Sequence, residues 1–195
     1  MIFGATIVVL VVLFVVVLVV LSVIWLVQTQ NRLVYSEELC QNALSQIGVQ
    51  QSSRWDALSA LVDLTKNYSE HEYRVLIKAI TTRKSVGPET PINEAQEQEN
   101  MLKNSFGRIF ALAEAYPDLK SNTVYIKTME SVRELEGQVR MSRMVYNDTV
   151  TKYNRLVRAF PTSLVVIMFD FRVRYYLQTD SGKAEMPSMI SPESF

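Results

Sequence analysis

The chain opens with a continuous apolar run. From Ile2 to Val27 it reads IFGATIVVLVVLFVVVLVVLSVIWLV, in which only Thr6 and Ser22 are mildly polar. A helix of this length extends ~39 Å at 1.5 Å per residue, which exceeds the ~30 Å hydrocarbon core of a bilayer. No basic residue precedes the run and no A-x-A sequence follows it, as a cleaved signal peptide would require. The pattern therefore predicts an uncleaved transmembrane anchor over residues 1–27.

The residues that flank the anchor indicate its orientation. Only the α-amino group precedes it, whereas Arg32 follows it, and basic residues near a span tend to remain in the cytoplasm. We therefore expect a short N-terminus outside and the rest of the chain in the cytoplasm. Trp25 and Tyr35 are then expected in the membrane interface, on either side of Arg32, because aromatic rings of membrane proteins gather there.

After the anchor, apolar residues recur at intervals of three and four, the spacing of helices rather than of strands. Because each apolar stripe must be buried against another, the pattern predicts an all-α fold: the anchor, then an up-and-down four-helix bundle over residues 28–161. The first helix is expected to continue from the anchor to Ile47 and to loosen at Gly48. The other three are expected along Leu58–Ala79, from an N-cap at Asn93 to Tyr116, and from Ser121 or Asn122 to Phe160.

The tail, residues 162–195, combines apolar, aromatic and basic residues. Leu164–Phe169 is apolar and ends in an aromatic ring, and the residues that follow have the composition of a membrane interface: Phe171, Arg172, Arg174, Tyr175 and Tyr176. This segment is too short and too charged to be a second span. We expect Leu164–Leu177 to be ordered at the membrane-proximal end of the domain and Thr179–Phe195 to be loosely held. A tail folded back over the bundle and a strand paired with another chain are the alternatives.

Composition adds two limits to this picture. All 20 Lys+Arg and 20 Asp+Glu residues lie after Val27, and the net charge is zero. The part behind the anchor thus resembles an ordinary soluble domain, without the basic excess that is typical of nucleic-acid binding. The single cysteine, Cys40, has no partner for an intrachain disulfide, so packing must supply the stability.

Candidate chemistry is scarce in the sequence. His71-Glu72 is half of the zinc-protease sequence H-E-x-x-H, but Val75 stands where the second imidazole is required. We interpret His71 as a hydrogen-bonded residue at the edge of a helix stripe, and the run Glu94–Glu99 as the solvated first turns of a helix. Cys40 has neither a resolving thiol nor a nearby imidazole. We therefore expect no enzyme activity, no metal site and no cofactor.

Two Tyr-Asn pairs stand out in the last predicted bundle helix. Tyr146-Asn147 and Tyr153-Asn154 lie seven residues apart, which places them on one face of a helix, two turns from each other. A polar residue repeated at heptad spacing beside a buried stripe is one way to fix the register of packed helices. Intramolecular register is one interpretation, and a recognition face for another helix is the other.

Several stretches of the sequence resemble the LemA family. The most specific are E-A-Y-P-D-L-K-S-N, from Glu114 to Asn122, and Y-N-D-T-V-T-K-Y-N, from Tyr146 to Asn154. Further residues that carry the resemblance are Gln46-Ile47-Gly48-Val49-Gln50, Arg54, Asp56, Leu61-Val62, Tyr68, His71-Glu72, Tyr116-Pro117-Asp118, Glu136, Arg143 and Phe160-Pro161. The similarity covers nearly the whole chain. The chain departs from the family at Ser53 and Ser59, where an Arg and a Pro are usual, and in the loop Gly87–Pro91.

The resemblance implies a single span, a short N-terminus outside, a cytoplasmic four-helix bundle and no catalytic residues. It also implies a scaffold or adaptor that acts on other proteins of the bacterial inner membrane, with an HtpX-type metalloprotease as one candidate partner. Relatives among magnetosome membrane proteins give the alternative, a self-assembling protein that shapes or organises the membrane, with lipid and further copies of the chain as partners. A metal-binding or enzymatic bundle is the third and least favoured interpretation.

Overall fold

The computed structural model describes residues 2–178 of the chain, with side chains from residue 10 onward. The prediction for Thr179–Phe195 therefore lies outside the described residues. Within the described part the fold is all-helical, as predicted, and no strand is present. Its helices are α1 (Ile2–Thr65), α2 (Glu70–Thr81), α3 (Ile92–Ala115), α4 (Pro117–Lys120), α5 (Thr123–Arg158) and α6 (Thr162–Phe169).

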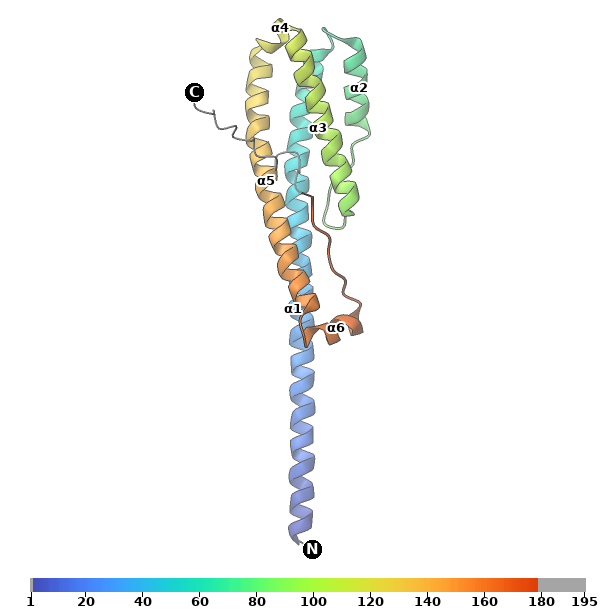
Figure 1. Cartoon of the computed structure of the whole chain (residues 1–195), viewed down its shortest axis with the longest axis vertical. Coiled ribbons are helices and arrows are strands. Elements are labelled where there is room, and N and C mark those ends of the chain that lie inside the picture. Colours follow the sequence, from blue (N-terminus) through green and yellow to red (C-terminus); the bar gives the residue numbers. More distant parts are fainter. Residues whose placement is uncertain (1, 179–195) are drawn as a thin grey trace, which may run out of the picture.

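The helix that begins in the apolar run does not end at the border of that run. α1 is one helix of 64 residues, so the prediction that it passes residues 28–31 without a break is confirmed. Among the described residues, α1 contains the one segment that is long and apolar enough to cross a membrane. Figure 1 shows its first half standing alone and its second half inside the domain. The same helix thus carries the candidate span and the centre of the domain.

The predicted division of the chain at Gly48 is wrong. α1 continues through Gly48 to Thr65, and the chain turns only there. Ser69 then caps α2, because its hydroxyl oxygen accepts a hydrogen bond from the backbone N–H of Glu72. The helix predicted along Leu58–Ala79 is therefore divided between the end of α1 and the short α2.

Gly48 allows another segment of backbone to approach α1 closely, and it does not end the helix. A Cβ built on Gly48 would overlap the carbonyl oxygen of Val86, which lies in the connection between α2 and α3. This carbonyl can cross α1 here only because glycine has no side chain. A glycine that marks such an approach inside a regular helix has the same sequence signature as a glycine that ends one.

The helices alternate in direction along α1. Figure 1 shows that α2 returns from the far end, α3 runs back towards it, α4 makes the corner there, and α5 descends beside α1. The dominant contact is between α1 and α5, whereas α2 has 12 residues and covers only part of the far half. The four long helices that the pattern predicted are thus replaced by one long helix pair with two shorter helices against it.

The ends of the helices agree with the sequence only in part. The helix α5 was predicted to start at Ser121 or Asn122, and Asn122 is its N-cap. The side-chain oxygen of Asn122 accepts hydrogen bonds from the N–H groups of Val124 and Tyr125. The N-cap predicted at Asn93 is wrong, because α3 already begins at Ile92, after Pro91, and has no side-chain cap. The proline preceding the helix presets the entering backbone and leaves the first N–H groups of α3 without a side-chain acceptor.

Two apolar clusters hold the domain together. The one nearer the apolar run joins α1, the start of α3, α5, α6 and the tail, and includes Leu33, Cys40, Ala43, Leu44, Ile47, Val86, Ala95, Tyr146, Val150, Tyr153, Val157, Val165 and Leu177. The far cluster joins α1, α2, α3, α4 and α5, and includes Trp55, Leu58, Leu61, Val62, Leu76, Leu102, Phe106, Ile109, Leu119 and Val132. Because Leu33 and Val157 share a cluster, the end of α5 returns to the end of the domain that faces the apolar run, as predicted.

The tail turns back on itself after α6. Asp170 has a left-handed backbone (φ 54°), which reverses the chain at the C-terminal end of the helix. Residues 171–178 then run back along the domain. The prediction that the whole of Leu164–Leu177 lies at the membrane-proximal end is therefore wrong beyond α6, and the alternative of a tail folded back over the bundle describes this segment. Only the α6 part of Leu164–Leu177 stays at the end of the domain nearest the apolar run (Figure 1).

The close approach at Gly48 gives a first prediction. Gly48→Ala should destabilise the protein by about 1–3 kcal/mol, although alanine is the better helix former, because the Val86 backbone must move. Gly107→Ala and Gly137→Ala are matched controls, since a Cβ there meets nothing within 4 Å. They should stabilise their helices by about 0.5–1 kcal/mol. Unfolding of the full chain in detergent, followed by circular dichroism, measures all three, and a gain of stability for Gly48→Ala would contradict the account.

Candidate functional site

The two Asn residues of the Tyr-Asn pairs bind the backbone of the tail. Asn147 donates to the Leu177 carbonyl at 3.0 Å and accepts from the Leu177 N–H at 3.0 Å. Asn154 makes the same two bonds to Arg174, both at 2.9 Å. Each side-chain amide therefore pairs with the backbone N–H and C=O of one residue, as the opposite residue of a neighbouring strand would. We call these four residues the tail clasp.

The spacing of the clasp follows from the geometry of the two chains. Seven residues of α5 separate the two Asn side chains, which is a rise of ~10.5 Å along the helix. Three residues separate Arg174 from Leu177, and an extended chain covers ~10 Å in three residues. The two distances agree, so one straight segment of tail satisfies both amides. The heptad spacing therefore fits an extended segment that runs antiparallel to α5, rather than the register of two helices.

The tyrosines of the same pairs lie beneath the tail. The Tyr146 hydroxyl donates to the Tyr175 carbonyl at 3.0 Å, whereas the Tyr153 hydroxyl is buried with no hydrogen-bond partner among the described residues. Burial raises the pKa of both phenols to about 12, with the nearby Arg174 opposing the shift. Since the folded state holds these protons more tightly, it loses stability as pH rises above 10.

The tail is also tied to α1 by charge. Arg174 donates to the Glu37 carboxylate at 2.9 Å, and both side chains are partly buried. The thiol of Cys40 is fully buried in the same region, and burial raises its pKa. A protonated, inaccessible thiol is a packing group here rather than a nucleophile.

The structure places the other residues predicted at the membrane interface in two groups. Phe171 packs against the nearer cluster, Arg172 pairs with Asp170 at 2.9 Å, and the Tyr176 hydroxyl lies 3.4 Å from the Thr151 hydroxyl. These residues therefore follow the tail along the domain. The residues on α1 and at the end of α6 lie where the apolar run meets the domain, and they are exposed: Trp25, Arg32, Tyr35 and Phe169.

A hollow of about 930 Å³ lies beside the clasped tail. Its walls come from α1, from the start of α3 with the residues before it, from α5 and from the tail, and they include Glu37, Gln96, Tyr146 and Arg174. The tail thus forms one wall of the hollow. Any movement of residues 172–178 would open or close it.

A second buried polar group lies in the middle of the domain and escaped the sequence analysis. The Arg54 guanidinium, 3% exposed, contacts Glu99 at 2.8 Å, and Gln51 donates to the same carboxylate at 3.1 Å. The predicted solvated position of Glu99 is therefore wrong. Ala95, Glu99 and Leu102 are spaced by four and three residues, so Glu99 lies on the buried face of α3. This spacing was the signal that could have predicted its burial.

This buried pair joins three helices. Arg54 on α1 faces Glu99 on α3 and lies 3.8 Å from Glu136 on α5, with its guanidinium 5.8 Å from the centre of the Phe106 ring. Loss of one partner from a buried ion pair leaves the other charge desolvated, at a cost of about 3–5 kcal/mol. The arrangement therefore specifies how α1, α3 and α5 sit against one another.

The motif residues of the far end form a structural corner. Tyr116 ends α3 and packs on Tyr68 with ring centres 5.5 Å apart, Pro117 begins α4, and Glu114 pairs with Lys120 at 2.8 Å. Leu119 is buried, whereas Asp118 is exposed. The sequence E-A-Y-P-D-L-K-S-N thus builds the turn from α3 to α5, and its Asn122 caps α5.

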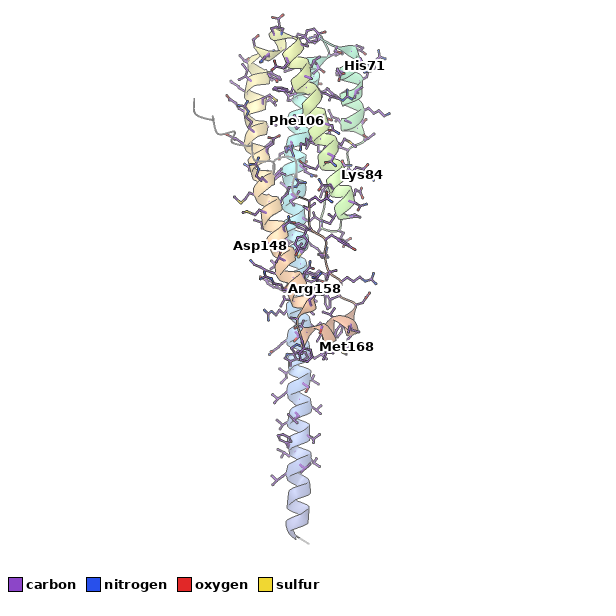
Figure 2. All side chains as sticks on the ribbon, viewed as in Figure 1. His71, Lys84, Phe106, Asp148, Arg158 and Met168 are labelled. Atoms are coloured by element: carbon purple, nitrogen blue, oxygen red, sulfur yellow. The ribbon has the colours of Figure 1, made fainter. Side chains whose placement is uncertain are left out.

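His71 lies at the same far end, on α2 (Figure 2). It is exposed and has no hydrogen-bond partner among the described residues, so its interpretation as a hydrogen-bonded edge residue is wrong. The neighbouring Glu72 accepts from Arg108 on α3 at 3.2 Å. Within residues 10–178, no group of three or more His, Cys, Asp or Glu side chains is arranged to hold a metal ion.

The clasp yields the second prediction. Asn154→Ala should cost about 1–3 kcal/mol and release the tail, because the backbone N–H and C=O of Arg174 both lose their side-chain partner. Amide hydrogen exchange over residues 171–178 should accelerate in this variant and in Asn147→Ala. Asn104→Ala, at an exposed position on α3, is the control and should leave the tail protected. Equal exchange of the tail in all three variants would show that the amides do not hold it.

The sequence of the chain is similar to those of known proteins. The magnetosome protein MamQ of Magnetospirillum gryphiswaldense is 24% identical over 87% of this chain and 71% of its own length. The proteins MamQ 1 and MamQ 2 of Paramagnetospirillum magneticum match with the same identity and coverage. The model of the LemA family matches residues 43–190, which is more than half of the chain and includes the clasp, the corner and the buried Arg54. The chain therefore belongs to the LemA family.

Proposed function

We propose that this protein is a non-enzymatic, single-pass scaffold or adaptor of the bacterial inner membrane, with its helical domain in the cytoplasm. The observation that carries the proposal is the continuity of α1, which holds the apolar run and the core of the domain in one helix. From Val27 to Thr65 this helix rises ~57 Å, so it holds the surface of the domain at fixed heights above the bilayer. Fixed height and orientation are what a platform for other membrane proteins requires.

The outer face of α5 offers a surface for such partners. Met141, Met144 and Val145 are adjacent on the helix, at intervals of three and four, and all are exposed. An apolar strip of this kind is what one helix presents to another, and methionine side chains adapt to differently shaped neighbours. Because Asn147 and Asn154 already bind the tail, we place the partner surface on this neighbouring strip rather than at the Tyr-Asn pairs.

The alternative is a self-assembling protein that organises the membrane. The names of the relatives favour it, since all three are magnetosome proteins. The same strip on α5 would then meet a second copy of the chain. A membrane metalloprotease remains a candidate partner under the first proposal, and a further copy of the chain is the partner under the second.

Gentle-detergent capture of the full chain from its native membranes, with quantitative mass analysis, separates these functions. We expect a defined membrane protein to be recovered with the wild-type chain and at least tenfold less with Met144→Glu, which places a charge at the centre of the α5 strip. Asn104→Glu introduces the same charge at an exposed position on α3 and should capture the partner as well as wild type.

Two outcomes would contradict the scaffold proposal, and a third would contradict only its assignment to the α5 strip. Recovery of large assemblies of the chain alone would favour self-assembly. Bound metal in stoichiometric amount would favour the third interpretation, a metal-binding bundle. Equal recovery of the same protein with wild type and Met144→Glu would remove the α5 strip as the partner surface.

A further inference from the structure

The short helix α6 exposes most of its apolar side chains. Only Val165 is buried, whereas Ile167 and Met168 are 79% and 66% exposed, and Leu164 and Phe169 are exposed as well. Phe160, just before the helix, is 83% exposed. Large apolar side chains gathered on one small surface mark a contact with another apolar phase or molecule. The domain itself therefore leaves this surface uncovered.

The position of α6 relative to the apolar run indicates what covers it. Val165 packs in the same cluster as Leu33, so α6 lies beside the first buried turn of α1. Only six residues separate Leu33 from Val27, a rise of ~9 Å along the helix. The headgroup region extends ~5–7 Å beyond the hydrocarbon core on each side, so Leu33 lies just outside it. Figure 1 shows α6 on the side of the domain that faces the apolar run, so its exposed side chains lie at the outer edge of the headgroup region. Figure 2 shows Met168 and Arg158 at this end of the domain.

The charges around α6 fit the same surface. Arg155 and Arg158 occupy the last turn of α5, and Arg32 lies on α1 one residue before Leu33. All three are exposed, and none is ion-paired to another residue within the described part of the chain. Basic side chains beside an apolar surface attract anionic headgroups. Asp170 lies at the C-terminal end of α6, and its negative charge is compensated by an ion pair with Arg172.

We propose that α6 and Phe160 insert into the headgroup region of the leaflet from which α1 emerges. The occupant of the exposed surface is thus the lipid bilayer itself, with a preference for anionic lipid. The helix is only eight residues long, ~12 Å, so it lies in the interface and does not cross the membrane. This inference rests on the proposed anchoring by α1. It adds a second membrane contact, which limits the tilt of the domain against the membrane.

Spin labels on single introduced cysteines test the proposal in the full chain. Cys40 is fully buried, so it stays in place, and labels are attached at Ile167→Cys on α6, Leu18→Cys in the apolar run and Met144→Cys on α5. The chain is reconstituted at high dilution in phosphatidylcholine/phosphatidylglycerol vesicles. Collision rates with oxygen, which concentrates in lipid, and with a water-soluble nickel chelate then report the surroundings of each label.

We expect the labels at Ile167 and Leu18 to collide preferentially with oxygen and the label at Met144 with the nickel chelate. An aqueous label at Ile167 beside a lipid-exposed label at Leu18 would overturn the contact of α6 alone. An aqueous label at Leu18 would overturn the anchor, and this proposal with it. Protection of Ile167 that disappears on dilution in lipid would show that a second copy of the chain, rather than the bilayer, covers α6.

Discussion

The unbroken hydrogen-bond ladder of α1 is the constraint on which the rest of the molecule depends. Each backbone N–H of this helix is bonded within the helix itself, and the helix continues beyond Val27 to Thr65 without a break. From Leu33 onward the same helix turns one stripe of side chains inward, and both apolar clusters are built against that stripe. The domain is therefore not linked to the apolar run by a hinge; it is assembled on the continuation of the same rod.

The inward side of α1 must be covered along its whole length within the domain, and different elements of the chain pack against different parts of it. α5 runs along most of the domain and makes the dominant contact with α1. The shorter α2 and most of α3 cover the far half, and α6 and the tail, with the first residues of α3, cover the near half. The tail is extended, so its backbone groups need partners that a helix would have provided itself, and the clasp provides them. The side-chain amides of Asn147 and Asn154 thus replace the missing neighbour of an extended segment.

Much of the fold could be predicted from the sequence because it follows from long, regular patterns. The apolar run, the continuity of α1 through residues 28–31, the cap of α5 at Asn122 and the return of α5 to the near end all follow from periodicity and end signals. The role of Gly48 could not be predicted from the sequence. A glycine is required there because the Val86 carbonyl, in a loop distant in sequence, approaches position 48 too closely for a side chain. A local pattern contains no information about such an approach.

The polar groups of the domain were harder to predict than its helices, for a related reason. Glu99 stands in a run of acids and has the sequence of a solvated turn, yet Arg54, 45 positions earlier, draws it into the core. The two Asn residues were recognised as a pair on one face, but their partners are backbone groups of Arg174 and Leu177, which no side-chain pattern indicates. Composition predicted an interfacial tail, and the structure divides that tail between α6 and the clasped segment.

Hydrogen exchange along α1 tests the central claim most directly. The full chain in lipid discs is exposed to deuterated water, and the amides of residues 28–33 are compared with those of residues 44–47, which lie within the nearer cluster. A continuous rod predicts slow exchange in both segments, since each N–H is bonded within the helix. Exchange of residues 28–33 at the rate of an unstructured peptide, with residues 44–47 still protected, would show a hinge between the membrane and the domain and would contradict the account.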